Sequence, residues 1–308
     1  MSTETCHFKG LPNLGNTCYI NSSIQSFLHS NHLKTFLSTH DVTANLLSFE
    51  NYKSLINDLK SVLPSYFAIY QQNDVHEFLM YYIDSIYEKH KKRFCIKNND
   101  TSSDSAYKKL QFKCNEAWFK NYSPIMDTLY FQTVRQTECS VCDHKNLNFE
   151  NNSILEVDII DGNNDDLTSS IQRNFTSYYI EDWTCDKCNE KSEKNRVIQQ
   201  LWYLPKVLIV CVKRFKFHNN TMMKLKNTFK IPNEINLQKH CLKQNCNYEY
   251  KLSSVINHLG SSYYGHYNCD LITPKNAIIK IDDEIIINKT NNKLNEENCY
   301  ILFYETTR

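Results

Sequence analysis

The sequence predicts a protein of the α+β class, and three observations support this prediction. Helical periodicity is confined to the first third of the 308-residue chain, whereas short β-rich runs dominate after about residue 125. Two Cys-x-x-Cys pairs lie within the β-rich part. No internal repeat is visible, and the length suits one large domain or two small ones.

The first predicted helix covers residues 19–29. Apolar side chains at Ile20, Ile24 and Phe27 recur at helical spacing, which indicates one buried face. Either Asn16 or Thr17 is suited to cap the free N–H groups of the first turn. The helix follows a turn rich in Gly, Pro and Asn, so that Cys18 stands where the turn meets the helix.

The clearest helical pattern extends from Val75 to Tyr87, where apolar residues keep helical spacing over three turns. Asp74, followed three residues later by Glu77, resembles a capping box. The polar segment 97–105 has no periodicity and is predicted to be a mobile loop.

Runs of β-branched and aromatic residues predict strands in the remainder of the chain. These runs cover residues 129–134, 154–159, 207–212 and 299–304. The polar segment 291–298 predicts a loop before the last strand, and Gly162 lies in a predicted ordinary turn.

The composition excludes several classes of protein. The net charge of +1 gives no general attraction to nucleic acid or to a membrane surface, and no apolar run reaches the roughly 18–20 residues of a membrane helix. The polar N-terminus lacks the apolar stretch of a signal peptide, so we expect a protein of the cytoplasm or nucleus. Thirteen cysteines cannot all pair as disulfides. In a reducing compartment they serve more often as ligands, nucleophiles or small apolar side chains.

The two Cys-x-x-Cys pairs predict one structural zinc ion. Two residues between cysteines let both sulfurs of a tight turn reach a metal about 2.3 Å away, and four thiolates suit tetrahedral zinc with no position left for catalysis. The predicted ligands are Cys139, Cys142, Cys185 and Cys188. The alternatives to this zinc site are a redox-active cysteine pair and buried cysteines that serve only as apolar side chains. His144 is an alternative ligand in place of one cysteine. Cys241 and Cys246, near His240, are not expected to form a second metal site.

A nucleophilic site is predicted from Cys18 and His266. Four of the five glycines lie in the two short blocks that contain these residues, and the blocks supply turns in which a side chain can be presented closely. The N-terminus of a helix favours a thiolate at Cys18, and an imidazole can pair with that thiolate and later protonate a leaving amine. The alternative is a buried cysteine and an unrelated histidine in a turn.

Two further groups complete the candidate site. A carboxylate is needed to orient the imidazole, and Asp282 and Asp283 follow His266 along the chain. Because adjacent residues of a strand face opposite sides, we expect only one of them to do so. The backbone N–H of Cys18 and the side-chain amide of Asn13 are candidate donors to an oxyanion.

The motifs resemble those of the ubiquitin-specific protease family, the papain-like deubiquitinating cysteine peptidases. The block around Cys18 resembles the cysteine box of this family, and His258 to Tyr267 resembles its histidine box. Four further segments resemble motifs of the family and follow one another in the same order along the chain. They are residues 72–79, the two Cys-x-x-Cys pairs, residues 204–215 and the terminal strand 299–304. The resemblance extends from about residue 10 to residue 304.

The resemblance implies a single catalytic domain, residues 1–308, with a papain-like cysteine protease fold. A helical thumb (about 1–124), zinc-tipped β fingers (about 125–200) and a β palm (about 201–308) are expected. The implied activity is that of a cysteine-type ubiquitinyl hydrolase, which cleaves the isopeptide or peptide bond after the C-terminal Gly-Gly of ubiquitin on proteins or chains.

The resemblance also assigns roles to residues by position. The implied roles are nucleophile for Cys18, base for His266, orienting carboxylate for Asp282, oxyanion donor for Asn13, and substrate binding for Gln72, Asp74 and Tyr267. Asp74 is expected to hold the basic residues of the ubiquitin tail. The sequence departs from the family pattern at Asn73, where a second Gln is usual, and at Ile278, where a Trp is common.

Other functions remain as alternatives. The same chemistry acting on a ubiquitin-like modifier is one, and a scaffold that binds ubiquitin without cleaving it is another. A zinc-ribbon protein that binds nucleic acid is disfavoured by the net charge of +1 and by the absence of a basic stripe. Ubiquitin and ubiquitinated proteins are thus the expected partners, with an activating partner left open and no nucleic-acid or membrane partner expected.

Overall fold

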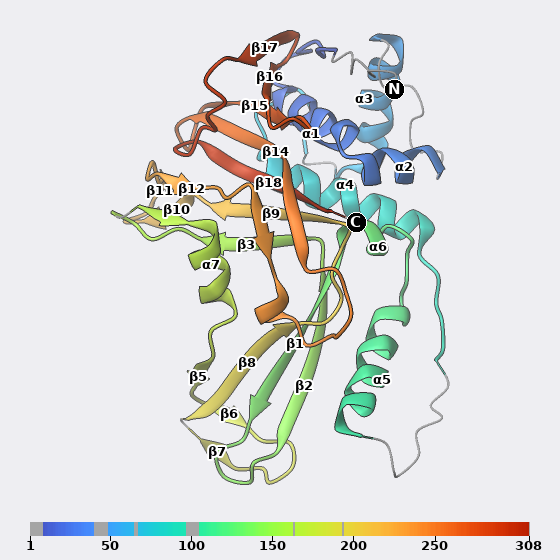
Figure 1. Cartoon of the computed structure of the whole chain (residues 1–308), viewed down its shortest axis with the longest axis vertical. Coiled ribbons are helices and arrows are strands. Elements are labelled where there is room, and N and C mark those ends of the chain that lie inside the picture. The colour runs from blue at the N-terminus through green and yellow to red at the C-terminus, as the bar shows by residue number, and fades with distance from the viewer. Residues whose placement is uncertain are drawn as a thin grey trace.

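Most of the described helices lie before residue 130, and the described strands begin at Phe131 or later, which confirms the α+β prediction (Figure 1). The computed structural model describes residues 9–39, 49–64, 67–96, 105–162, 164–192 and 194–307. The loop predicted at 97–105 lies outside the described residues except for Ser105, and Cys6 lies outside them as well. Among the described residues, no helix is both long and apolar enough to cross a bilayer.

Both predicted helices are present, and the structure adds several others. The helices are α1 (Cys18–His29), α2 (Asn31–Thr39), α3 (Phe49–Val62), α4 (Val75–His90), α5 (Ala106–Phe119), α6 (Met126–Leu129) and α7 (Leu167–Asn174). Asp74 caps α4 as predicted, because its side chain accepts hydrogen bonds from the backbone N–H groups of His76 and Glu77. The helix α1 packs against β14 and β15, and this contact brings the start of the helix to the large sheet.

The large sheet has eight strands, and its order is β17-β16-β15-β14-β18-β9-β3, with β13 also pairing with β14. Its members are β3 (Ile154–Asp158), β9 (Val207–Lys213), β13 (Glu234–Asn236), β14 (Glu249–Gly260), β15 (Gly265–Ile272), β16 (Ile278–Asp282), β17 (Ile285–Lys289) and β18 (Cys299–Thr306). Only β3 and β9 pair in parallel, and the other pairs are antiparallel. Three predicted strands are confirmed here, and the predicted polar loop at 291–298 precedes β18.

A smaller four-stranded sheet extends away from the large one, in the order β2-β1-β8-β5 (Figure 1). The remaining strands form two-stranded pairs: β6 with β7, β10 with β11, and β4 with β12. The bounds are β1 (Phe131–Glu138), β2 (Lys145–Asn152), β4 (Asp165–Asp166), β5 (Tyr178–Ile180), β6 (Trp183–Thr184), β7 (Lys191–Ser192), β8 (Asn195–Leu201), β10 (Phe215–His218), β11 (Thr221–Lys224) and β12 (Phe229–Lys230). The strand predicted from residue 129 begins only at Phe131, because Leu129 ends the short helix α6 and is buried there.

Alternate residues of the large sheet face two separate apolar cores. On β14, Ile256 belongs to the core shared with α1 and α4, whereas Val255 belongs to the core shared with α7. Burial on both faces therefore fixes the register of the sheet, and with it the place of each polar residue at the strand ends.

Arg214, directly after β9, is a fully buried cation that holds several loops together. Its Nε atom donates to the carbonyl of Cys299 at 2.5 Å, and Nη1 donates to the carbonyls of Leu225 at 3.1 Å and Asn227 at 2.9 Å. Nη2 donates to the carbonyl of Glu296 at 2.7 Å. The planar fork of an arginine can satisfy four carbonyls at once, which a lysine cannot.

Replacing Arg214 with methionine is expected to lower the free energy of unfolding by at least about 3 kcal/mol, because each buried carbonyl left without a donor costs about 1–3 kcal/mol. Urea unfolding monitored by tryptophan fluorescence measures the change. The matched control is Arg196→Met, since Arg196 is exposed, and that change is expected to stay within about 0.5 kcal/mol. Equal effects of the two changes would show that the buried bonds of Arg214 contribute little.

Candidate active site

The loop before α1 is organised by the side chain of Asn13. Its Oδ1 atom accepts hydrogen bonds from the backbone N–H groups of Gly15 at 3.0 Å and Thr17 at 3.1 Å. Thr17 occupies the N-cap position, but its side chain makes no capping bond to the helix and instead accepts a bond from the N–H of Leu14 at 3.0 Å. Thr17, one of the two predicted candidates, is thus the N-cap residue by position, but its side chain does not cap the helix. The turn presents Cys18 as the first residue of α1, where it is 6% exposed.

His266 lies near the start of β15 and faces a carboxylate on the neighbouring strand β16. Its Nε2 atom is 2.5 Å from Oδ1 of Asp282. The other oxygen of Asp282, Oδ2, is 3.2 Å from Nζ of Lys280 and 3.5 Å from Nδ2 of Asn268. Asp282 is thus held on both oxygens, and it holds one nitrogen of the imidazole.

Hydrogen bonds raise the pKa of His266 to about 9. The bond to Cys18 is the largest cause, burial acts in the opposite direction, and the bond to Asp282 adds to the increase. For Asp282, burial alone favours the neutral acid, but the bonds from His266 and Lys280 leave the pKa of its carboxyl below the ordinary value. The arrangement therefore favours a charged imidazolium beside the carboxylate of Asp282 near neutral pH.

Asp283 also lies near His266, although the two aspartates were expected to face opposite sides of a strand; of the two, Asp282 is the one hydrogen-bonded to the imidazole. The Oδ2 atom of Asp283 is 4.0 Å from Nε2 of His266. Strand alternation fails here because Asp283 begins the turn after β16 and has a φ of 52°. Asp282 makes the short contact with the imidazole, while Asp283 lies farther from it.

The amide of Asn13 contacts this second carboxylate. Its Nδ2 atom donates to Oδ2 of Asp283 at 2.9 Å. An amide nitrogen carries two hydrogens, so a second hydrogen is available to another acceptor. Asn13 therefore connects the loop before α1 with Asp283 after β16.

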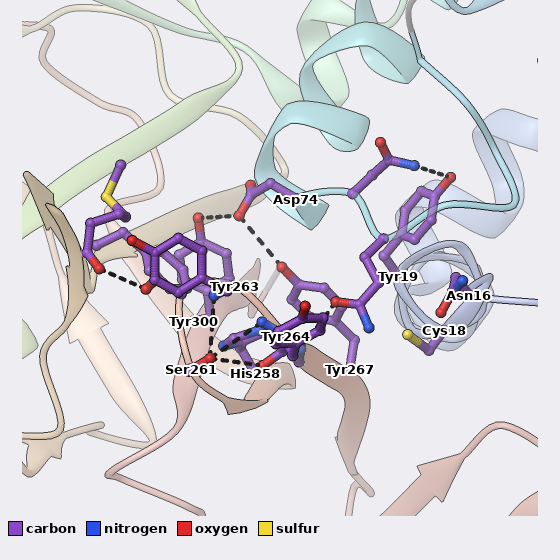
Figure 2. A pocket seen from close by; sticks show the side chains of 16 residues that line it. Asn16, Cys18, Tyr19, Asp74, His258, Ser261, Tyr263, Tyr264, Tyr267 and Tyr300 are labelled. Atoms are coloured by element: carbon purple, nitrogen blue, oxygen red, sulfur yellow. Dashed lines mark hydrogen bonds between the residues drawn. The ribbon is translucent and has the colours of Figure 1, made fainter.

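A groove of about 370 Å³ lies beside Cys18, between the segment before α4 and the loop that joins β14 to β15 (Figure 2). The predicted residues Gln72, Asp74 and Tyr267 all line it. Gln72 accepts a hydrogen bond from the N–H of Gly265 at 3.2 Å. Oδ2 of Asp74 accepts bonds from the hydroxyls of Tyr300 at 2.9 Å and Tyr267 at 3.4 Å. Asp74 therefore fixes two walls of the groove as well as capping α4.

His258 packs into the wall of this groove against Gly265. A Cβ atom on Gly265 would collide with the imidazole of His258, so this position requires glycine. Burial, followed by the nearby charges of Lys224 and His266, lowers the pKa of His258 to about 4. Two histidines of the same hairpin are thus held in opposite states, His258 neutral and His266 charged.

The four predicted metal-ligating cysteines come together at the far end of the small sheet. Their sulfur atoms all lie within 4.8 Å of one another, and the Sγ–Sγ distances are 3.8 Å for Cys139–Cys188 and 3.8 Å for Cys142–Cys185. Four sulfurs bound at about 2.3 Å to a tetrahedral ion are about 3.8 Å apart, so the donor set fits zinc. His144 lies 3.2 Å from Asp186 and is not part of the cluster.

The two cysteine turns have the same backbone design. In the first, the N–H of Asp143 donates to the carbonyl of Cys139, and in the second the N–H of Asn189 donates to the carbonyl of Cys185. Asp143 and Asn189 both have a positive φ, 55° and 59°, which turns the chain sharply after the second cysteine of each pair. The backbone bonds of each turn therefore hold its two sulfurs close together.

Sequence reasoning missed Asn21 and Tyr52. Asn21 is 2% exposed and donates through Nδ2 to Oδ1 of Asp283 at 2.7 Å, while its Oδ1 atom accepts a bond from the hydroxyl of Tyr52. The available signal was a polar residue three positions after Cys18, beside the apolar face of the predicted helix. The partner in the β16–β17 turn could not be identified from the sequence.

Comparisons with known proteins agree with this geometry. A family model described as "Ubiquitin carboxyl-terminal hydrolase" matches residues 9–304. Ubiquitin carboxyl-terminal hydrolase Usp2 of Drosophila melanogaster is 26% identical over 334 residues, which cover 97% of this chain and 35% of the relative. Probable ubiquitin carboxyl-terminal hydrolase 16 of Schizosaccharomyces pombe is 23% identical over 325 residues, which cover 96% of this chain and 66% of the relative. The chain thus spans between about a third and two thirds of the length of these relatives.

Solved structures show the same fold. A SAGA DUB module of Ubp8, Sgf11, Sus1 and Sgf73 bound to monoubiquitin contains a chain that matches with a TM-score of 0.76 and 17% sequence identity. The match covers 98% of this chain and 69% of that chain. A module of the same four proteins bound to ubiquitin aldehyde matches with a TM-score of 0.73 and 17% identity, over 98% of this chain and 70% of that chain.

Proposed function

Because the chain belongs to the ubiquitin carboxyl-terminal hydrolase family, we propose that it is a thiol-dependent deubiquitinase. It hydrolyses the peptide or isopeptide bond after the C-terminal Gly-Gly of ubiquitin, on proteins or on chains. The observation that carries this proposal is the place of Cys18, which begins α1 and lines a groove, together with the hydrogen bond of 2.5 Å between Nε2 of His266 and Oδ1 of Asp282. This arrangement provides a nucleophile, a proton donor and an orienting carboxylate.

In the proposed reaction the thiolate of Cys18 attacks the carbonyl carbon of the last glycine. The resulting oxyanion accepts hydrogen bonds from the backbone N–H of Cys18 and the amide of Asn13. The imidazolium of His266 gives its proton to the leaving amine as the C–N bond breaks, which leaves a thioester. Neutral His266 then takes one proton from water, and the resulting hydroxide adds to the thioester carbonyl. The C–S bond breaks and returns the thiolate of Cys18, while the carboxylic acid of ubiquitin loses the remaining proton to solvent and His266 is again an imidazolium.

Substrate binding is assigned to the groove residues. Gln72, Asp74 and Tyr267 line the groove beside Cys18, and Asp74 brings a carboxylate to it, which suits a basic peptide tail. Within a single catalytic domain, we assign a thumb to about residues 1–124, fingers to about 125–200 and a palm to about 201–308. The globular body of ubiquitin would lie between the fingers and the palm.

The cysteine cluster is assigned one structural zinc ion. Cys139, Cys142, Cys185 and Cys188 supply four thiolates, so the metal has no open position and takes no part in the reaction. Reduced cysteines at both the cluster and the nucleophile agree with a place in the cytoplasm or nucleus. A matched structure contains partner subunits, so an activating partner for this chain is also proposed, without any statement of which protein it is.

The test is hydrolysis of a fluorogenic amide of the ubiquitin C-terminus by the purified protein. Release of the fluorophore, abolished by prior alkylation of thiols, is expected. Parallel assays with amides of ubiquitin-like modifiers give a second result, since turnover of these alone would keep the chemistry and change the substrate. Binding of ubiquitin without turnover would support a scaffold instead.

The rate is expected to depend on pH through His266. Because the imidazolium is the active form and its pKa is about 9, kcat/KM should fall as the pH rises through about 9. Asp282→Asn removes one of the bonds that raise this pKa, so the alkaline limb should move to lower pH. The loss in kcat/KM at pH 8.5 should lie in the range of about 10²–10⁴-fold that proton-transfer groups contribute.

The matched control for this measurement is Asp182→Asn, because Asp182 is an exposed carboxylate paired with Lys191 on the small β6–β7 pair. The control should keep both the rate and the alkaline limb of the wild type. If the fall of kcat/KM at high pH occurs at the same pH in Asp282→Asn as in the wild type, Asp282 does not orient His266.

A further inference from the structure

Asn21 is a buried amide between the nucleophile helix and the β16–β17 turn. It lies one turn after Cys18 on α1 and is 2% exposed. Its Nδ2 atom donates to Oδ1 of Asp283 at 2.7 Å and to the carbonyl of Pro12 at 3.2 Å. Both hydrogens of the amide therefore have an acceptor, which leaves the side chain a single orientation.

Tyr52 of α3 fixes that orientation from the other side. Its hydroxyl is bonded to Oδ1 of Asn21, and the residue is fully buried. Burial raises the pKa of Tyr52 to about 12, so the hydroxyl stays protonated. Since the carboxylate of Asp283 can only accept, Asn21 must face it with its nitrogen, and Tyr52 must then donate to the amide oxygen.

Asp283 passes this constraint to Asn13. Oδ1 of Asp283 receives the bond from Asn21, and Oδ2 receives the bond from Nδ2 of Asn13 at 2.9 Å. The backbone adds a clasp: the N–H of Leu11 donates to the carbonyl of Asp283 at 3.0 Å, and Gly10 packs so closely on Glu284 that a Cβ atom would collide with its backbone. The Nδ2 end of Asn13 is thereby held from the palm side.

The oxygen end of Asn13 is held from the thumb side, where Oδ1 accepts from the N–H groups of Gly15 and Thr17. With both ends fixed, the plane of the amide is set, and the second hydrogen of Nδ2 has a fixed direction. An oxyanion donor is effective only when it is held in place before the charge develops. The direction of this hydrogen therefore depends on a chain of bonds that begins at Tyr52.

We propose that Asn21 and Tyr52 are positioning residues, which hold Asp283 and, through it, the amide of Asn13 as an oxyanion donor. This inference rests on the proposed hydrolase function. Neither residue lines the substrate groove, so their effect is expected on the chemical step and not on ubiquitin binding. They act only through Asn13, so their effect should vanish when Asn13 has no amide.

A double-mutant cycle tests this dependence. kcat and KM for the ubiquitin C-terminal amide are measured for the wild type, Asn13→Ala, Asn21→Ala and the double variant. Loss of an oxyanion donor costs about 10²–10³-fold in kcat, so Asn13→Ala should fall in that range and Asn21→Ala should lose about 10–100-fold. KM should change less than about threefold in each, because a group that acts only in the transition state alters kcat and not KM. The double variant should be no slower than Asn13→Ala.

Tyr52→Phe provides a milder variant that keeps Asn21 in the fold. It removes one hydrogen bond and should lower kcat by about two- to tenfold in the wild type, and not at all in Asn13→Ala. The matched control is Tyr250→Phe, because Tyr250 is fully buried and its hydroxyl donates to the carbonyl of Pro205 at 2.6 Å. The control should show a similar change in thermal stability and an unchanged kcat.

Two results would overturn the inference while the proposed function stands. The first is a double variant whose loss in kcat equals the product of the losses in Asn13→Ala and Asn21→Ala. The second is a rise in KM at constant kcat for Asn21→Ala or Tyr52→Phe. A wild-type protein that hydrolyses neither ubiquitin nor ubiquitin-like amides would overturn the proposed function first, and the inference with it.

Discussion

Replacing Cys18 with alanine is expected to lower kcat/KM for the ubiquitin C-terminal amide by about 10⁴–10⁶-fold, because the variant has no thiolate in the groove to form the thioester. Binding of ubiquitin should change by less than about threefold. Cys18 is only 6% exposed, so the substitution removes one sulfur atom and little binding surface. Initial rates measure the first quantity, and titration calorimetry with ubiquitin measures the second.

The matched control is Cys95→Ala, since Cys95 is an exposed thiol that does not line the groove. The control protein should keep the wild-type rate and should still be inactivated by alkylation. A Cys18→Ala protein that retained more than a hundredth of the activity would require another nucleophile and would exclude the proposed mechanism. Loss of ubiquitin binding in the same protein would instead point to a disturbed fold.

Breaking the cysteine cluster is expected to have the second largest effect, this time on stability. Cys185→Ser should lower the zinc content from one ion per chain to none and should unfold the end of the small sheet. Structural zinc contributes about 10–16 kcal/mol to the folding of zinc-finger peptides, and even a fraction of this exceeds the stability of a four-stranded sheet. Atomic emission gives the zinc content, and hydrogen exchange of the small sheet gives the local stability.

The control for the cluster is Cys246→Ser. The Sγ atom of Cys246 lies 3.9 Å from that of Cys241, and these two thiols are not part of the four-cysteine cluster. This change should leave the zinc content at one ion per chain. A Cys185→Ser protein that still held a full equivalent of zinc would place the metal elsewhere, and a wild type without zinc would leave the cysteines as a cluster of thiols.

Much of the fold could be predicted because the decisive patterns are local. The helices around Ile24 and Phe78 have strong periodicity, and the strands at 207–212 and 299–304 are runs of β-branched and aromatic residues. The prediction that a strand begins at residue 129 was wrong, because leucine is compatible with both a strand and a buried helical turn. The packing around α6 decides between these two conformations at Leu129. The position of β18 between β14 and β9 has no local signal at all.

The candidate site shows the same division between local and tertiary information. The four metal-ligating cysteines could be predicted from their spacing alone, since the two cysteines of each pair lie in one turn. Strand alternation does not apply to Asp283, because β16 ends at Asp282 and Asp283 begins a turn with a positive φ, and no local sequence signal marks that end of the strand. Asn21 and Tyr52 were missed because their roles depend on Asp283, which lies more than two hundred positions farther along the chain.

The order of strands in the large sheet has a consequence for biosynthesis. β18 is flanked by β14 and β9, yet it leaves the ribosome after every other strand of this sheet. Until it is inserted, β9 and β14 have no partner between them, and their apolar faces and backbone groups stay open to other chains. The nucleophile of α1 is thus made early, while the sheet that carries His266 can close only at the end. The nascent protein should therefore be inert until β18 has been made and inserted between β14 and β9.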